Sequence, residues 1–431
     1  MTTRIRQVAC LGILSGLLLA GCSAAQPQTE NTLASSSLGT STSTAEGSTP
    51  EPTSEPSSGP SSSSEASTSP AVPSSTHGTE APKTIAEQAQ ALARKMSPSQ
   101  QAASLVMAGI PAAGATDGEI SQLQKQGISN IFLRGRSQLS VSQTAEQVKK
   151  AAGALEQNLP QDLPVWVATD QEGGFVRVLQ GPGFSELPTA QKQGQWSQAT
   201  LKSRLAGVGA ELVKAGINVN LAPVADVVPK SIGTANAPIG YFGRQYGDNA
   251  QDVASSVLTA NQSFAEAGVQ PVVKHFPGLG KVTANTDVSS SVTDSTTGAD
   301  SPDLAPFKKS IAQDLSWVMI SNARYTKIDA KNDAPFSSKV ITGLLREKLG
   351  YERLVISDDL CEAQQVESVP VGQRAVKFVA AGGTMPLCVN TENSLVMAKA
   401  LADKAEGDAA FAGKVQDAAA LVLQEKLRQQ K

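Results

Sequence analysis

Short apolar segments alternate with amphipathic ones from about residue 85 to the C-terminus. Eight of the apolar segments have the length and composition of strands that are buried on both faces. Continuous apolar strands separated by helices are typical of a parallel sheet. The predicted strands are residues 103–110, 128–133, 165–169, 217–222, 270–274, 317–321, 354–357 and 385–389.

The amphipathic segments between these strands predict helices, several of which end at a glycine. Gly216, Gly268, Gly350 and Gly382 each follow a helical segment, where glycine readily adopts the left-handed conformation of a helix end. Eight strand–helix units in about 300 residues favour an α/β fold of the (β/α)8 TIM-barrel type over an open doubly wound sheet. The predicted helices include residues 85–96, 144–158, 201–215, 250–267, 304–314, 340–349 and 374–381.

The N-terminal segment has the order of an export signal. Arg4 and Arg6 precede an apolar run over residues 8–20, which is shorter than the roughly 20 residues of a membrane-spanning helix. Small residues and Cys22 follow, as in a bacterial lipoprotein signal in which the cysteine carries the lipid. An apolar helix of a cytosolic protein is the alternative, and the polar segment that follows disfavours it.

Residues 23 to about 83 are rich in Ser, Thr, Pro, Gly and Glu, and the first aromatic residue of the chain is Phe132. Such a segment cannot bury enough apolar surface to offset the entropy of ordering it. We therefore predict a signal peptide at 1–21, a lipidated disordered tether at 22–83 and one folded domain at 84–431.

Charge and composition exclude several classes of function. The formal charge is −3 and no Lys/Arg cluster occurs, which argues against a nucleic-acid partner. The chain has two histidines and no metal-ligand spacing, so we expect neither a metal nor a cofactor. In an exported protein Cys361 and Cys388, at neighbouring predicted strands, could form a disulfide or remain two buried thiols.

Charged residues follow three of the predicted strands. Asp170 and Glu172 come after one strand, Lys274 at the end of another, and Asp358 after a third. Barrel strands carry their chemistry at the carboxyl ends, so these groups are expected at one rim. Individually they could be helix caps or turn residues, and Lys274 could form a buried ion pair with Asp170. Jointly, a carboxylate-rich rim without metal ligands suggests glycoside hydrolysis.

Six strings spread over residues 105–389 resemble glycoside hydrolase family 3, in the family's order. The Pro-Gly that follows Lys274-His275-Phe276 resembles the single-domain β-N-acetylglucosaminidase branch more than the multidomain β-glucosidases. The strings are DQEGG (170–174), GINVNLAPVADV (216–227), R-x-Y-G (244–247), KHFPGLG (274–280), DLAPF (303–307) and ISDDL (356–360).

This resemblance implies a role for individual residues. Asp358 is the implied catalytic nucleophile, and the side chain of its neighbour Asp359 is expected to point elsewhere. The residues that would hold the hydroxyls of a terminal sugar are Asp170, Arg244, Lys274 and His275. Arg177 is an additional binding candidate, because the family usually has an arginine one position later, where this chain has Val178. Asn322 replaces a histidine that is frequent in the family.

The sequence departs from the family at the residue that moves the proton. The resembled branch has Asp-Ser-His where this chain has Asn285-Thr286-Asp287, and a further family histidine corresponds to Leu279. Asp287 is the candidate acid/base, because a carboxyl donor is usual in other glycosidases. The polar composition of residues 278–293 predicts a loop that swings Asp287 over the site. The alternatives are Asp294 or Glu172 as the acid/base, or a protein that binds sugar and turns over slowly.

The resemblance therefore implies a retaining exo-β-N-acetylglucosaminidase that acts on terminal GlcNAc of peptidoglycan-derived fragments. The open alternatives are a β-glucosidase, a glycoside phosphorylase, and a catalytically weakened sugar-binding lipoprotein. We expect a monomer, bound through the lipid of Cys22 to the outer face of the cytoplasmic membrane.

Overall fold

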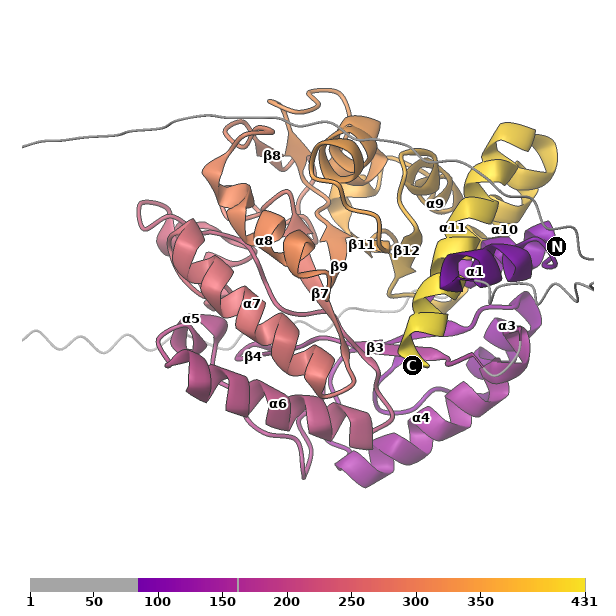
Figure 1. The fold of residues 1–431 in the computed structure, drawn as a ribbon, viewed down its shortest axis with the longest axis horizontal. Coiled ribbons are helices and arrows are strands. Elements are labelled where there is room, and N and C mark those ends of the chain that lie inside the picture. The colour runs from indigo at the N-terminus through magenta and orange to yellow at the C-terminus, as the bar shows by residue number, and fades with distance from the viewer. Residues whose placement is uncertain (1–83, 161–162, 431) are drawn as a thin grey trace, which may run out of the picture. The chain divides into compact units, whose positions relative to one another are not determined.

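The computed structural model describes residues 84–160 and 163–430. The predicted signal peptide and tether lie outside these residues. Eight parallel strands close into a barrel in the order β1-β12-β11-β9-β7-β6-β3-β2, with helices around it (Figure 1). This confirms the predicted (β/α)8 architecture. The barrel strands are β1 (Met107–Pro111), β2 (Asn130–Arg134), β3 (Trp166–Thr169), β6 (Val219–Asn220), β7 (Gln270–Phe276), β9 (Trp317–Ile320), β11 (Val355–Asp359) and β12 (Met385–Cys388).

Helices follow most of the strands and cover the barrel. The left-handed φ angles of Gly216, Gly268, Gly350 and Gly382 (78°, 86°, 68° and 103°) confirm the predicted helix ends. The helices are α1 (Ile85–Ala93), α2 (Pro98–Leu105), α3 (Asp117–Gln126), α4 (Val141–Leu155), α5 (Ala190–Gln193), α6 (Gln198–Lys214), α7 (Ala250–Glu266), α8 (Ala305–Gln313), the π-helix η6 (Lys339–Lys348), α9 (Val371–Ala380), α10 (Thr391–Gly407) and α11 (Ala409–Gln429).

Short elements decorate the loops. Two small sheets pair β4 (Gln171–Gly173) with β5 (Val176–Arg177), and β8 (Thr293–Asp294) with β10 (Arg324–Tyr325). The 3-10 helices are η1 (Glu156–Asn158), η2 (Gly233–Ala235), η3 (Gly240–Phe242), η4 (Pro302–Leu304), η5 (Ala334–Phe336) and η7 (Gln364–Val366).

The prediction for residues 103–105 is wrong, because these residues end helix α2 instead of beginning strand β1. The helix starts at a capping box, in which the Ser97 side chain accepts a hydrogen bond from the backbone of Gln100 and the Gln100 side chain reaches back to Ser97. The capping box lies before the apolar run that begins at residue 102. Because this run continues from the helix into the strand without a polar break, the boundary between them does not show in the sequence.

Two barrel strands are irregular at their carboxyl ends. The register of β7 against β9 shifts between Val273 and Phe276, and that of β11 against β12 shifts between Ile356 and Asp359. Bulges turn side chains away from the regular alternation and are frequent next to active sites. The shifts fall where the sequence places Lys274, His275 and Asp358.

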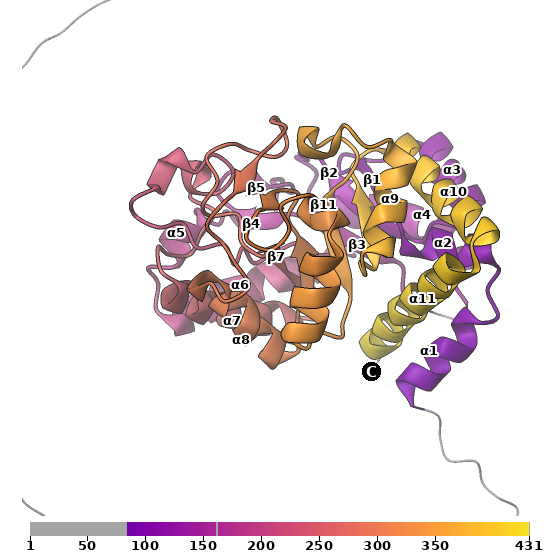
Figure 2. The ribbon, with the colours of Figure 1, turned by 90° about the horizontal axis from the view of Figure 1, so that it is seen from above.

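The opposite end of the barrel is closed by the C-terminal helix α11, which packs beside α1 (Figures 1 and 2). The indole nitrogen of Trp317 donates to Glu425, which also pairs with Arg353 at 2.6 Å. The buried ammonium of Lys426 lies 4.0 Å from the ring centroid of Trp166. Trp166 and Trp317 are the first residues of β3 and β9. A ligand can therefore enter at the carboxyl ends of the strands.

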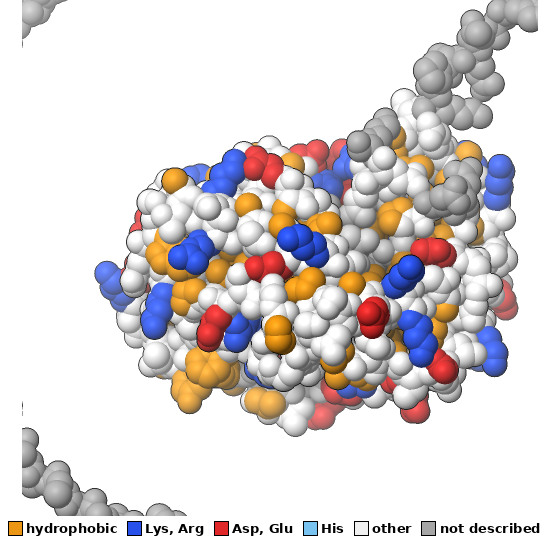
Figure 3. Space-filling view, turned by 90° about the horizontal axis from the view of Figure 1, so that it is seen from below, with side chains coloured by type: hydrophobic (Ala, Val, Ile, Leu, Met, Phe, Trp, Pro, Cys, Tyr) orange, Lys and Arg blue, Asp and Glu red, His pale blue; other side chains and the backbone are white. Residues whose placement is uncertain are grey.

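The surface of the described residues carries both charges. On the face shown in Figure 3, Lys and Arg side chains are interspersed with Asp and Glu, without a large area of one sign. Across residues 84–160 and 163–430, none of the helices has the length and apolar content needed to cross a membrane.

Candidate active site

A cavity of about 490 Å³ opens at the carboxyl ends of the barrel strands. Its walls come from the ends of β3, β7 and β11 and from the loops that follow them, as the barrel fold leads one to expect. Six of the residues singled out in the sequence line it together: Asp170, Arg244, Lys274, His275, Asp287 and Asp358.

Four charged side chains on one wall form a buried network. The ammonium of Lys274 lies 2.6 Å from Asp170 Oδ1 and 2.7 Å from Glu172 Oε1. Arg244 donates to both carboxylate oxygens of Glu172, at 2.9 and 2.8 Å. The buried ion pair of Lys274 with Asp170 therefore exists, and both residues face the cavity as well. A bidentate pair of this kind fixes the guanidinium plane.

The network determines the charges of its members. Burial alone would raise the pKa of Glu172, but Arg244 and Lys274 outweigh it and lower this pKa to about 2. Burial would lower the pKa of Lys274, but Asp170 and Glu172 outweigh it, and the net shift is upward. Both Glu172 oxygens are paired with Arg244 and Lys274, and Glu172 lies outside the lining of the cavity, so it cannot reach a leaving oxygen there. The alternative of Glu172 as acid/base is wrong for this reason.

His275 is held by an aspartate that the sequence reasoning did not single out. Asp226 is fully buried, and its Oδ2 lies 2.7 Å from His275 Nδ1. Its Oδ1 accepts from the backbone N–H groups of His275 and Leu279, at 3.2 and 2.6 Å. With Nδ1 bound to Asp226, His275 Nε2 is left beside Arg244, 3.4 Å from Nη2. The signal for Asp226 was present in the string GINVNLAPVADV, of which it is the only acidic residue.

Asp358 lies at the end of β11 with its carboxyl group at the cavity. Its Oδ1 accepts from the backbone N–H of Asp359 at 2.8 Å. Burial, and then the negative charge of Asp287, raise the pKa of Asp358 to about 6, against the opposing charges of His275 and Lys274. The carboxylate is therefore mostly ionised at neutral pH and poorly solvated, which favours nucleophilic attack.

The carboxylate of Asp359 differs from that of Asp358 in its hydrogen bonds. Its Oδ1 accepts from the backbone N–H groups of Cys361 and Val389, both at 3.0 Å, and its Oδ2 accepts from Glu362 N at 2.8 Å. These bonds turn the Asp359 carboxylate toward the backbone, as expected for the neighbour of Asp358. Asp359 therefore shapes the loop that follows β11.

Asp287 is exposed and lines the cavity from the loop after β7. Its charge acts on Asp358, but the loop is more restrained than its composition predicts. The backbone carbonyls of Thr286 and Asp287 accept from the N–H groups of Gln365 and Gln364, at 3.1 and 3.3 Å. Hydrogen bonds from a segment distant in sequence thus hold the loop at Thr286 and Asp287, and the swing of Asp287 over the site stays a prediction.

Asp294 lies within the described residues but outside the lining of this cavity. Its carboxylate accepts from the backbone N–H groups of Thr296 and Thr297, at 2.6 and 2.8 Å, and from the hydroxyl of Thr297 at 2.6 Å. These bonds outweigh burial and lower its pKa. The alternative of Asp294 as acid/base is wrong, because its carboxylate is buried and engaged in a turn.

Two further expectations concern the rim. Arg177 is described, but its side chain lies outside the lining of the cavity and points to the Ser185 carbonyl, 3.5 Å away, and to Glu186 at 3.8 Å. Arg177 is therefore not placed to contact a sugar in this cavity, because β5 turns its side chain toward the next loop. Asn322 donates to the Asp359 carbonyl at 2.8 Å and so supports the end of β11.

Cys361 and Cys388 form a disulfide, with their Cα atoms 5.0 Å apart. The bond ties the segment just after Asp358 and Asp359 to strand β12. Of the two alternatives left open by the sequence, the structure thus has the bridge.

Comparison with known proteins gives a consistent result. The model of the glycosyl hydrolase family 3 N-terminal domain matches residues 99–424. A beta-hexosaminidase of Nitrosomonas eutropha is 30% identical over 297 residues, which cover 67% of this chain and 81% of that protein.

Solved structures are similar over the barrel. The crystal structure of a beta-N-acetylhexosaminidase from Beutenbergia cavernae has a TM-score of 0.74 and 41% sequence identity, covering 77% of this chain and 98% of that one. A glycoside hydrolase family 3 beta-N-acetylglucosaminidase from a Paenibacillus species has a TM-score of 0.69 and 27% identity, covering 78% of this chain and 64% of that one.

Proposed function

The chain belongs to glycoside hydrolase family 3, and from this premise we propose that it is a retaining exo-β-N-acetylglucosaminidase. The observation that carries the proposal is the position of Asp358, a poorly solvated carboxylate that shares one cavity with the network of Asp170, Lys274 and Arg244. The beta-hexosaminidase relatives support N-acetylglucosamine as the sugar.

The paired network leaves a defined set of groups for a sugar. Lys274 has three N–H donors and uses two on carboxylates, so one remains. Arg244 has five and uses four, on Glu172, on the Pro238 carbonyl and on His275 Nε2, so one remains. Asp170 binds Lys274 through Oδ1, which leaves Oδ2 as an acceptor. Two fixed donors and one fixed acceptor recognise adjacent hydroxyls of one terminal ring.

The reaction follows the double displacement of retaining glycosidases. Asp358 Oδ2 attacks the anomeric carbon while Oδ1 stays bound to the Asp359 N–H. The bond from that carbon to the leaving oxygen breaks, and Asp287 protonates this oxygen. Water then attacks the glycosyl-enzyme, Asp287 takes its proton, and Asp358 is released as a carboxylate. Both carboxyl groups line the same cavity, which supports this division of roles.

The proposed location follows from the N-terminal sequence. Residues 1–21 resemble a lipoprotein signal, Cys22 is the proposed lipid site, and the following segment to residue 83 is a polar tether. A barrel held in this way at the outer face of the cytoplasmic membrane would meet peptidoglycan fragments with terminal N-acetylglucosamine. We therefore propose such fragments as substrates of a monomeric enzyme.

The experiment is a comparison of substrates with the purified protein. Aryl β-N-acetylglucosaminide is expected to be hydrolysed much faster than aryl β-glucoside, with retention at the anomeric carbon seen by NMR. Faster hydrolysis of the glucoside would show that the protein is a β-glucosidase. Release of a sugar phosphate when phosphate is added would show that it is a glycoside phosphorylase. Calorimetric binding of N-acetylglucosamine without turnover of either substrate would contradict an enzyme.

A further inference from the structure

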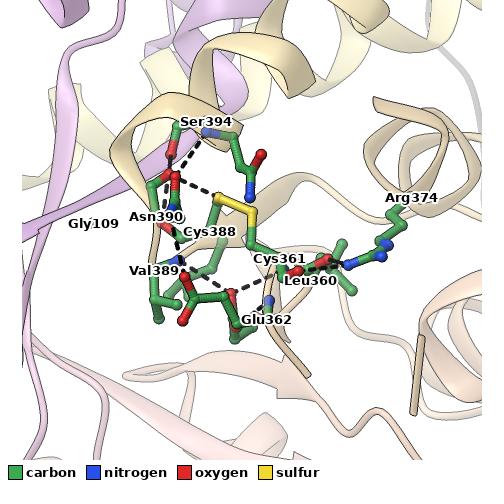
Figure 4. Close-up of a disulfide and its surroundings, with 12 residues drawn as sticks. Gly109, Leu360, Cys361, Glu362, Arg374, Cys388, Val389, Asn390 and Ser394 are labelled. Carbon is green, nitrogen blue, oxygen red and sulfur yellow. Dashed lines mark hydrogen bonds between the residues drawn. A yellow bond between two sulfur atoms is a disulfide. The ribbon is translucent and has the colours of Figure 1, made fainter. Parts of the chain in front are cut away.

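The segment after the proposed nucleophile runs over residues 360–366, and we call it the β11 strap. It is fixed at its start by two kinds of link (Figure 4). The disulfide of Cys361 with Cys388 joins it to strand β12, and Asp359 accepts from the N–H groups of both Cys361 and Val389. The strap is thereby attached to two neighbouring barrel strands, one of which carries Asp358.

A buried arginine holds the strap from the other side. Arg374 of helix α9 donates through Nη1 to the carbonyls of Leu360 and Cys361, both at 2.7 Å, as Figure 4 shows. Its Nε donates to the Val369 carbonyl at 2.6 Å. Charged donors on backbone carbonyls form strong hydrogen bonds. The strap is therefore part of the rigid frame of the nucleophile.

The far end of the strap holds the loop of Asp287. The backbone N–H groups of Gln364 and Gln365 donate to the carbonyls of Asp287 and Thr286. The side chain of Gln365 continues the contact, because its Oε1 accepts from Val292 N at 2.6 Å and its Nε2 donates to Val292 O at 3.3 Å.

The amide of Gln365 is itself fixed in orientation. Nε2 also donates to Asp333 Oδ1 at 3.0 Å, and the residue is 4% exposed. A carboxylate beside one end of the amide determines which end is the donor. Gln365 thus holds both sides of the turn at residues 286–292, while the turn itself is exposed, with Val288 66% exposed.

We infer that Gln365 is a positioning residue. It holds the Asp287 carboxyl group at the distance from Asp358 at which Asp287 can pass a proton to the leaving oxygen. The inference rests on the proposed role of Asp287 as acid/base. A retaining reaction needs its two carboxyl groups about 5 to 5.5 Å apart, and a displacement of about 1 Å can cost roughly a hundredfold in rate. Loss of the Gln365 side-chain amide releases the Val292 side of the turn, keeps the backbone bonds to Thr286 and Asp287, and leaves Asp358 in place.

The test compares Gln365→Met with the wild type on glycosides whose leaving groups differ in acidity. Methionine has a similar volume and lacks the amide, so it removes the Val292 contacts. We expect kcat/KM to fall at least about tenfold for poor leaving groups, since general acid catalysis contributes about 10² to 10⁴. An activated dinitrophenyl glycoside, which needs little protonation, is expected to change less than about threefold.

Gln101→Met is the matched control. Gln101 is a buried glutamine whose side-chain amide donates to the Ala93 carbonyl at 2.8 Å, and it lies on helix α2 outside the lining of the cavity. It loses a buried hydrogen bond of the same kind, so the leaving-group dependence is expected to stay that of the wild type. Gln365→Leu is the second variant should the methionine variant not fold, because it also lacks the amide and places no charge beside Asp333.

A double-mutant cycle with Asp287→Ala separates the outcomes. If Gln365 acts through Asp287, the double variant has the same dependence of kcat/KM on the leaving group as Asp287→Ala alone. Equal losses by Gln365→Met for good and poor leaving groups would overturn the positioning role alone. A wild-type leaving-group dependence in Asp287→Ala itself would overturn the acid/base assignment and, with it, the inference.

Discussion

The two sides of the cavity are built by different means. On one side Asp170, Glu172 and Lys274 lie at or just after the ends of strands β3 and β7, and Arg244 comes from the loop after η3. The four side chains are paired with one another and are largely buried. On the other side Asp287 is exposed and sits on a turn held by backbone hydrogen bonds. The first side recognises its ligand through fixed charges, and a substitution there disturbs the whole network. The second can vary without disturbing the barrel, and on this side, at Asn285-Thr286-Asp287, the sequence departs from the resembled family.

The largest expected effect is the loss of the nucleophile between the two sides. Asp358→Asn removes the attacking oxygen, so turnover should fall by several orders of magnitude. Asp359→Asn is the neighbouring control, and its effect should be milder because Asp359 binds backbone N–H groups. Steady-state kinetics with an activated aryl glycoside measures both. Similar losses in the two variants would mean that Asp358 has no special role.

Removal of a charged residue from the paired side should lower the free energy of unfolding strongly. Lys274→Met leaves Asp170 and Glu172 close together without their shared cation, and removal of one partner of a buried pair costs about 3 to 5 kcal/mol. Lys150→Met removes an exposed pair with Asp117 and should cost about 0 to 1 kcal/mol. Urea unfolding compares the two. Equal losses of unfolding free energy in the two variants would show that the Lys274 network does not stabilise the fold.

The pH dependence of kcat/KM should reflect residues on both sides of the cavity. The pKa of Asp358 is raised to about 6, first by burial and then by the charge of Asp287. Attack requires the ionised form, so kcat/KM should fall as the pH decreases through about 6. Asp287→Asn removes the negative charge, which should lower this pKa and move the acidic limb of the profile to lower pH. An unshifted limb in a pH–rate series would show that the two carboxyl groups do not interact.

The smallest expected effect lies outside the site. Cys22→Ala should release the protein from the membrane and leave its kcat/KM unchanged, because the residues that line the cavity lie between positions 132 and 389. Fractionation and a soluble assay test this. Loss of activity in the released protein would show that the N-terminal segment contributes to the fold or the site.

The sequence predicts the paired side better than the loop side, for a physical reason. Strand ends of a barrel meet at one rim, so Asp170, Lys274 and Asp358 could be placed together from the order of apolar segments alone. The bracing of the Asp287 turn depends on Gln365, which lies 73 positions from its partner Val292, and no local pattern predicts such a contact. The composition of the loop therefore predicts a polar loop but not the contacts that tie it to residues 364 and 365.

Asp226 illustrates the same limit within the paired side. It is the only acidic residue of the string GINVNLAPVADV, but its partner His275 is 49 positions away, and the ring contact appears only when β6 and β7 are paired. Arg177 shows the converse, because a plausible charge near a matched motif is turned away by the small strand β5.

The central claim is that Asp287 serves as the acid/base for a glycosyl-enzyme formed on Asp358. The most direct test measures Asp287→Ala on natural and activated substrates, with and without azide. We predict that activated aryl glycosides keep much of their first-step rate, that hydrolysis of natural disaccharides is lost, and that azide restores turnover as a β-glycosyl azide. Equal losses on both substrate types, with no azide product, would contradict the account.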